Sequence, residues 1–144
     1  MKKTLCLLLS IITIIGSLYV PAFANDSGIT PYLNNTSSAD LIFNIDSTGL
    51  AVSTVSLMGY TGVTTHAEIS TKIQKKNLIF FWKDVDIGYP DNTYTATITG
   101  VYGVDEAEFQ LSSKGTYRNL TTVTVYGTGG AADVLEFEIE YKYE

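Results

Sequence analysis

Apolar and polar residues alternate with a period of two along most of the chain from residue 41 onward, and this pattern constrains the fold more than any other feature. Short runs rich in Thr, Val, Ile, Tyr and Phe are separated by clusters of Gly, Asn, Asp and Ser. Their spacing is close to the roughly 8 to 12 residues that is typical of sandwiches and barrels. Because no segment shows convincing helical periodicity, the sequence predicts an all-β domain.

The clearest alternation lies at the end of the chain, where apolar residues oppose Glu136, Glu138 and Glu140. Residues 67–73 show the same one-sided pattern. Strands with one apolar face must bury those faces against each other, and two packed antiparallel sheets do so. We therefore predict an immunoglobulin-like antiparallel β-sandwich of about seven to eight strands. A small barrel is the alternative.

The first 24 residues have the form of a secretory signal peptide. A short basic start, Met1–Lys3, precedes an apolar run over residues 5–20, and Ala22-Phe23-Ala24 fits the small-x-small pattern of signal-peptidase cleavage. The apolar run is shorter than the roughly 20 residues that a membrane-spanning helix needs. We therefore expect residues 1–24 to be a cleaved signal peptide, and the mature protein to be secreted, extracellular and without a membrane span.

The mature chain divides into a polar N-terminal segment and one domain. Residues 25–39 are rich in Asn, Ser and Thr and lack periodic apolar residues, so we expect a flexible segment there. Residues 40–144 are enough for one hydrophobic core and hold the predicted β-sandwich. Cys6, the only cysteine, lies in the predicted signal peptide, so the mature domain must be stable without a disulfide.

The composition is acidic, with 9 Lys and Arg against 15 Asp and Glu. Lys2 and Lys3 leave with the predicted signal peptide, so the formal charge of the mature chain becomes 7 − 15 = −8. That balance disfavours nucleic acid and anionic lipid as partners, because both attract Lys and Arg. It also keeps a secreted chain soluble, and we expect a monomer.

Few residues of the mature chain have the chemistry that common hydrolases use. His66 is its one histidine, it has no cysteine, and it has neither a G-x-S-x-G nor an H-E-x-x-H motif. Strand alternation places His66 on the polar face, where we expect a surface residue rather than a general base. A zinc site usually needs several His or Cys ligands. We therefore predict that the protein is not an enzyme.

Three aspartates near one turn, Asp84, Asp86 and Asp91, are the only hint of a metal site. Ca²⁺ prefers several carboxylate and carbonyl oxygens around a turn, and Gly88 lies between these residues. Their spacing does not complete an EF-hand loop, so we favour solvated acids at a strand end over a calcium site. No other cofactor is expected.

The densest aromatic run, Phe80-Phe81-Trp82, has two interpretations. Alternation places Phe80 and Trp82 on the same side as the first two aspartates, which would form a sugar-stacking platform if that side were exposed, with Tyr89 at its rim. The interpretation that we favour has Trp82 buried at the centre of the sandwich. Which side of the sheet Trp82 faces therefore separates a binding surface from a core.

Several short segments, taken in order, resemble a known group of proteins. They are Gly59–Gly62, Ile73–Lys76, Trp82, Lys114–Arg118 and Val123–Tyr126. Their order is similar to that in an uncharacterised family of small secreted proteins of Gram-positive bacteria, which have a leader followed by one β-sandwich. The resemblance implies a compartment and a fold but no activity. Residues 89–108 are longer and more acidic than in that pattern, so the strand order stays open there.

One tyrosine has a structural interpretation that needs no family. Gly115 permits a turn, and Tyr117 enters the strand that follows. A hydroxyl at this position would bond a backbone group across the loop, as in the tyrosine corner of immunoglobulin-like sandwiches.

Together these observations favour a non-catalytic secreted protein that binds a cell-surface, polysaccharide or host partner through its loops or a sheet face. Export, a compact scaffold and few reactive groups support this hypothesis. The alternative is a small secreted carbohydrate-active enzyme that uses paired carboxylates, drawn from Asp84, Asp86, Glu106 and Glu108. Two carboxyl groups facing one pocket would favour that alternative.

Overall fold

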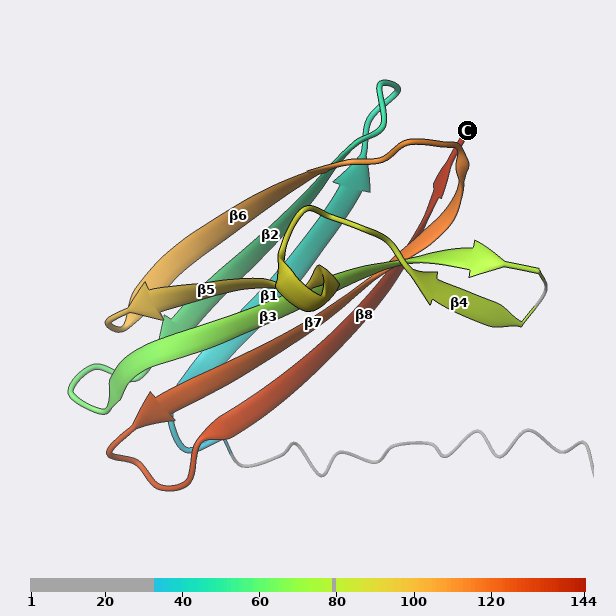
Figure 1. Cartoon of the computed structure of the whole chain (residues 1–144). Coiled ribbons are helices and arrows are strands. Elements are labelled where there is room, and N and C mark those ends of the chain that lie inside the picture. The colour runs from blue at the N-terminus through green and yellow to red at the C-terminus, as the bar shows by residue number, and fades with distance from the viewer. Residues whose placement is uncertain (1–32, 79) are drawn as a thin grey trace, which may run out of the picture. The chain divides into compact units, whose positions relative to one another are not determined.

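Two antiparallel β-sheets make up the part of the chain that the computed structural model describes, residues 33–78 and 80–144 (Figure 1). The eight strands are β1 (Thr36–Ile45), β2 (Leu50–Gly59), β3 (Thr64–Asn77), β4 (Phe81–Asp84), β5 (Tyr94–Thr99), β6 (Tyr102–Gln110), β7 (Gly115–Gly127) and β8 (Asp133–Tyr143). A short 3-10 helix, η1 (Pro90–Asn92), lies between β4 and β5. The all-β prediction is confirmed, whereas the predicted signal peptide, residues 1–24, lies outside the described residues.

The strand order is that of an immunoglobulin-like sandwich. One sheet has the order β1-β2-β6, and the other has the order β4-β3-β7-β8, with β5 also paired to β3. The immunoglobulin fold likewise places its first, second and fifth strands in one sheet and its third, sixth and seventh in the other. The correspondence holds when β4 and β5, which both pair with β3, are counted together as the fourth strand. The sequence left the strand order open between residues 89 and 108. In the structure the chain crosses there from one sheet to the other, between β5 and β6.

The core lies between the two sheets, and its residues come from the faces that alternation predicted. Ala67, Ile69, Thr71 and Ile73 of β3 are all buried, as are Leu41, Phe43 and Ile45 of β1. The buried side chains form two clusters. One holds Leu41, Val55, Leu57, Ala67, Ile69, Ile98, Val123 and Val125, and the other holds Phe43, Ile45, Ala51, Ile73, Ala107, Phe109, Leu111 and Tyr117.

The start of β7 carries the predicted tyrosine corner. Tyr117 is 1% exposed, and its hydroxyl donates a hydrogen bond to the backbone carbonyl of Ser113 in the preceding loop. Gly115, between them, has a φ of 151°, a backbone conformation that favours glycine. Tyr117 therefore joins the second core cluster to the loop between β6 and β7, and its expected structural role is confirmed.

The first strand begins at Thr36, within the segment expected to be flexible and before the domain boundary expected at residue 40. Asn35 and Thr36 are fully buried. The carboxylate of Asp133 accepts hydrogen bonds from the backbone N–H groups of Asn34 and Asn35 at 2.8 and 2.7 Å, and from the Thr36 hydroxyl at 2.9 Å. A carboxylate far along the chain therefore orders these polar residues, although they have no apolar pattern.

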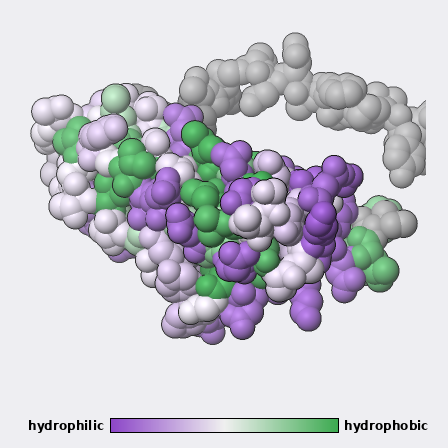
Figure 2. Space-filling view, turned by 90° about the horizontal axis from the view of Figure 1, so that it is seen from above, coloured by the Kyte–Doolittle hydropathy of each residue, from purple (hydrophilic) through white to green (hydrophobic). Residues whose placement is uncertain are grey.

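In the sequence, residues 75–77 have the polar composition of a turn, and residues 78–87 have the composition of the strand that would follow it. The structure instead extends β3 through Lys75 and Lys76 to Asn77, and β4 covers only Phe81–Asp84. The two strands form a hairpin that projects from the rest of the sandwich in Figure 1. Figure 2 shows hydrophobic side chains gathered at the projecting end, beside hydrophilic ones. The two lysines fit this strand because their side chains reach partners: Lys75 Nζ donates a hydrogen bond to Ser113 Oγ at 2.6 Å, and Lys76 Nζ lies 5.4 Å from the centroid of the Trp82 ring.

No helix within residues 33–78 and 80–144 combines the length and the hydropathy that crossing a bilayer requires.

Candidate functional site: a threonine-lined groove

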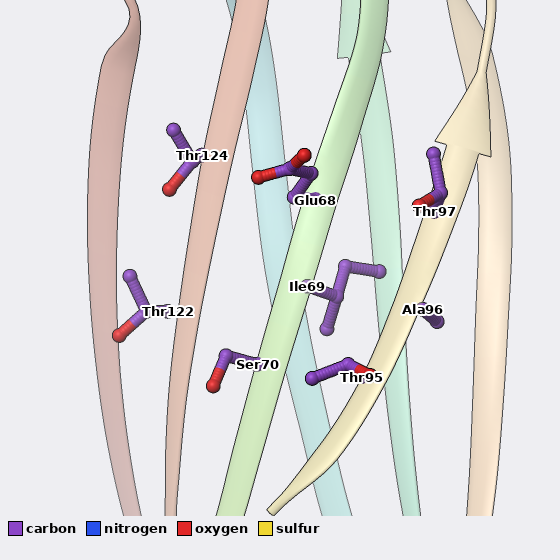
Figure 3. A pocket seen from close by; sticks show the side chains of 8 residues that line it. All are labelled: Glu68, Ile69, Ser70, Thr95, Ala96, Thr97, Thr122 and Thr124. Carbon is purple, nitrogen blue, oxygen red and sulfur yellow. The ribbon is translucent and has the colours of Figure 1, made fainter.

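The outer face of the β4-β3-β7-β8 sheet holds a shallow groove of about 370 Å³, which Figure 3 shows from close by. We call it the threonine groove. Its lining residues are Glu68, Ile69, Ser70, Thr95, Ala96, Thr97, Thr122 and Thr124. Five of these eight side chains carry a hydroxyl, so the groove presents many groups that both donate and accept hydrogen bonds.

Strand pairing places these side chains in rows across three strands. Glu68 of β3 pairs with Thr97 of β5 on one side and with Thr124 of β7 on the other. Ser70 pairs in the same way with Thr95 and Thr122. Neighbouring strands lie about 4.8 Å apart, so each row spans roughly 10 Å. In Figure 3, Glu68 and Ser70 lie between the threonines of β7 and those of β5.

The one carboxylate of the groove has a fixed orientation. The Tyr126 hydroxyl donates a hydrogen bond to Glu68 Oε2 at 3.0 Å. This hydrogen bond raises the pKa of the Tyr126 phenol, so the phenol stays protonated and can donate across the physiological pH range. The Tyr126 ring in turn stacks on His66, with centroids 4.7 Å apart and an interplanar angle of 9°.

A second shallow groove, of about 420 Å³, continues this face toward the sheet edge. Leu120, Thr121, Thr122, Glu136, Phe137 and Glu138 line it. Thr122 lines both grooves, so a polar, hollowed surface extends from β5 across β3 and β7 to β8. An extended ligand such as a polymer chain has room to cross several strands here.

The structure corrects both interpretations of Trp82. The side chain is half-buried on β4, outside the two core clusters, so it does not fill the centre of the sandwich. Its ring is not an open platform either, because the Arg118 guanidinium carbon lies 4.5 Å and Lys76 Nζ 5.4 Å from the ring centroid. Trp82 instead pairs with Lys76 across the hairpin, and the two cations lie against the indole.

Arg118 connects Trp82 to the sheet through two hydrogen bonds. Its Nε donates to Gln74 Oε1 and its terminal nitrogen donates to Glu138 Oε1, both at 2.8 Å. The guanidinium therefore has little freedom to move away from the indole. The role that this arrangement supports for Trp82 is to fasten the hairpin to the sheet.

The three aromatic residues predicted to bind a ligand do not form one surface. Phe80 lies at the exposed end of the hairpin, away from the connection between β4 and β5 that holds Tyr89. The Tyr89 ring packs edge-on against Tyr94 and Phe109, with centroids 5.3 and 6.5 Å away. Burial, and next to it the Asp105 carboxylate, raise the pKa of Tyr94 to about 12. The Tyr89 ring therefore packs in the loop over Tyr94, which is half-buried.

The predicted calcium ligands are not brought together. Asp84 accepts a hydrogen bond from Gln74 at 2.6 Å, and Asp86 accepts one from the backbone N–H of Gly88 at 3.0 Å. Asp91 lies in η1 with a φ of 51°. In the described part of the chain, no three His, Cys, Asp or Glu side chains lie close enough to hold a metal ion. Asp84 bonds within the β3–β4 hairpin, whereas Asp86 and Asp91 lie in the connection between β4 and β5.

The carboxylates considered for catalysis lie on different sheets. Asp84 belongs to β4, whereas Glu106 and Glu108 belong to β6 of the opposite sheet. Thr54 donates a hydrogen bond to Glu106 at 3.4 Å on that second outer face. None of these acids lines either groove.

Sequence reasoning did not identify the threonine groove. The alternation of Thr95, Thr97 and Thr99 is visible in the sequence, as is the pair Thr122 and Thr124. Threonine is also one of the commonest strand residues, so this signal alone does not separate a binding face from an ordinary sheet surface.

In a comparison with known proteins, no family model, curated protein or solved structure matches the chain.

Proposed function

We propose that the chain is a secreted, non-catalytic binding module and that it binds a neutral carbohydrate in the threonine groove. The observation that carries this proposal is the row of hydroxyl side chains around one oriented carboxylate, Glu68. Binding sites of this kind use a few placed polar groups to fix the orientation of a ligand. The proposal keeps the polysaccharide partner expected from the sequence and gives it a different surface.

Sugar hydroxyls both donate and accept hydrogen bonds, and Thr and Ser side chains do the same. Glu68 adds acceptors that are stronger than a neutral oxygen. Threonine methyl groups provide apolar contact for the C–H faces of a sugar ring. The acidic composition, with a formal charge of −6, favours a neutral ligand over an acidic polymer on this face.

The groove supports binding better than hydrolysis. Most glycoside hydrolases need two carboxyl groups on either side of the scissile bond. Glu68 is the one carboxylate that lines the threonine groove, and Glu136 and Glu138 of the adjoining groove lie on β8, two strands away from Glu68 on β3. The Thr65 hydroxyl lies 3.0 Å from His66 Nδ1, but it donates to the Tyr126 carbonyl at 3.1 Å. The carbonyl therefore competes with the imidazole for the single proton of this hydroxyl.

Export of this module rests on the signal-like residues 1–24, and an extracellular polysaccharide or cell-surface glycan is the partner that such a location supplies. We propose that the protein acts as a monomer, which its net negative charge favours.

The test is binding to an array of neutral oligosaccharides, followed by calorimetry with the best ligand. Glu68→Gln is expected to weaken binding at least about tenfold, because the groove loses a charged acceptor. Glu106→Gln is the matched control, since Glu106 also faces a threonine on an outer sheet face. The proposal is wrong if the two variants bind alike, or if the oligosaccharide is cleaved during the measurement.

A further inference from the structure

We propose that the end of the β3–β4 hairpin inserts shallowly into the surface of a phospholipid bilayer. The pairing of β3 with β7 ends at Lys75, whereas its pairing with β4 continues to Asn77. The last residues of the hairpin therefore form a two-stranded ribbon that leaves the sheet (Figure 1). A projecting ribbon can reach a membrane without the rest of the domain approaching it.

The end of this ribbon is the most exposed apolar surface of the described residues. Leu78 is 77% exposed, Phe80 83% and Phe81 67%. Leu78 follows the last residue of β3, Phe80 lies in the turn and Phe81 begins β4, so the exposed apolar side chains come from both arms of the hairpin and from its turn. A groove on a protein covers one side of such a ribbon, whereas a bilayer surrounds all of it. The arrangement therefore fits lipid better than a protein partner.

Basic residues gather behind the apolar end. Of the nine Lys and Arg residues in the chain, Lys2 and Lys3 lie outside the described part, which leaves seven. These seven lie in the C-terminal half of β3, in β4, around the start of β7 and at the end of β8, all toward the hairpin: Lys72, Lys75, Lys76, Lys83, Lys114, Arg118 and Lys142. The described basic residues are therefore concentrated toward the hairpin, where they lie among acidic residues such as Asp84, Glu140 and Glu144.

Two of these lysines are placed to meet phosphate groups. Lys76 and Lys83 are exposed and lie one or two residues behind Phe81 along the ribbon, a distance of about 3 to 7 Å. That spacing matches the roughly 5 to 10 Å depth to which apolar side chains enter the interface between headgroups and acyl chains. Within residues 33–78 and 80–144, only Arg118 and Lys142 contact a carboxylate.

Trp82 pairs with Lys76, one residue behind Phe81, where the apolar end meets the basic residues, and tryptophan favours such a position at membrane interfaces. It is also the one tryptophan of the chain, so its fluorescence reports on the hairpin alone. Insertion is expected to shift its emission to shorter wavelength and to allow quenching by brominated acyl chains.

The experiment measures co-sedimentation of the full chain with vesicles of phosphatidylcholine alone or with added phosphatidylglycerol. The test variant is L78S/F80S/F81S, and the matched control, I42S/Y102S/V104S, removes three exposed apolar side chains from the opposite sheet. All variants carry the same residues before Leu33, so any binding that those residues cause is equal in each. Circular dichroism verifies that each variant is folded.

We expect the wild type and the control to bind vesicles with phosphatidylglycerol, and the test variant to bind at least about tenfold more weakly. Replacing Lys76 and Lys83 with Gln should weaken binding mainly to vesicles with phosphatidylglycerol. The proposal is overturned if the wild type does not bind, or if the test variant binds as well as the control. It is also overturned if brominated lipid leaves Trp82 emission unchanged, the result expected of a hairpin that docks on a protein.

Discussion

Asp133, the first residue of β8, accepts a hydrogen bond of 2.7 Å from the backbone N–H of Asn35, which lies 98 positions earlier in the chain. Asp133 is 5% exposed, and its carboxylate also satisfies Asn34 and Thr36. The contact fixes the entry of the chain into β1 against the start of the last strand. It explains how a polar segment without an apolar pattern forms an ordered edge of the sandwich.

Replacing Asp133 with Asn is expected to lower the free energy of unfolding by about 1 to 3 kcal/mol, because a charged acceptor of buried donors is lost. Urea denaturation followed by circular dichroism measures this change. Asp40→Asn is the control, since Asp40 is exposed on β1 and should change stability by less than about 0.5 kcal/mol. Equal effects of the two substitutions would contradict the proposed anchor.

The same residue predicts a pH dependence. Burial alone would raise the pKa of Asp133, but its hydrogen bonds with Asn34, Asn35 and Thr36 outweigh burial and hold the pKa below the ordinary value of 3.8. A carboxyl whose pKa is lower in the folded state stabilises the protein above its unfolded pKa, and this stabilisation is lost as the pH falls through the folded value. The stability difference between wild type and Asp133→Asn should therefore be constant near neutral pH and shrink below about pH 4. A difference that grows on acidification would reject this assignment.

Tyr117→Phe tests the tyrosine corner. The substitution keeps the ring in the core and removes only the hydroxyl that donates to Ser113, so unfolding should become easier by about 1 kcal/mol. Tyr102→Phe, on the exposed outer face of β6, serves as the control and should leave the urea midpoint unchanged. If both variants unfold at the wild-type midpoint, the hydroxyl contributes nothing to stability.

Arg118→Met tests whether Arg118 fastens the hairpin to the sheet. Removing the guanidinium uncovers Trp82 and breaks the hydrogen bonds to Gln74 and Glu138. We expect stronger quenching of tryptophan fluorescence by acrylamide, and a loss of stability of about 1 kcal/mol. Lys142→Met removes a more exposed cation on β8 and should leave quenching unchanged. Equal quenching in both variants would mean that Arg118 does not shield the indole.

Tyr126→Phe tests how the Glu68 carboxylate is held. Without the phenol hydroxyl, Glu68 has lost the donor that orients it, and affinity for the oligosaccharide should fall about threefold to tenfold while the fold is kept. Calorimetry of Tyr126→Phe beside Glu68→Gln measures the two effects, and the single effects should not add in the double variant. Additive losses would show that the two side chains act independently.

The predictable part of the fold is the part that alternation encodes. Residues 67–73 and 133–143 show which face each strand buries, because a one-residue slip would expose the whole apolar set. The boundaries at Thr36 and Asn77 were not predictable in this way. The first depends on a carboxylate about a hundred positions away, and the second depends on lysines whose side chains reach Ser113 and Trp82.

The candidate site was harder to predict than the fold for a related reason. Trp82 and the three aspartates stand out in the sequence because their residue types are distinctive. In the fold, however, Trp82 contacts Arg118, Asp84 accepts a hydrogen bond from Gln74, and Asp86 accepts one from Gly88. The threonine groove is built from common strand residues, and only the pairing of β5 and β7 with β3 brings those residues together.

The most direct test of the central claim is a titration of isotope-labelled protein with the best neutral oligosaccharide, monitored through backbone amide chemical shifts. A ligand in the threonine groove should produce its largest shifts on β3, β5 and β7, around Glu68, Thr97 and Thr124. Largest shifts on β1, β2 and β6, or no shifts at saturating oligosaccharide, would contradict the claim that this face is the binding site.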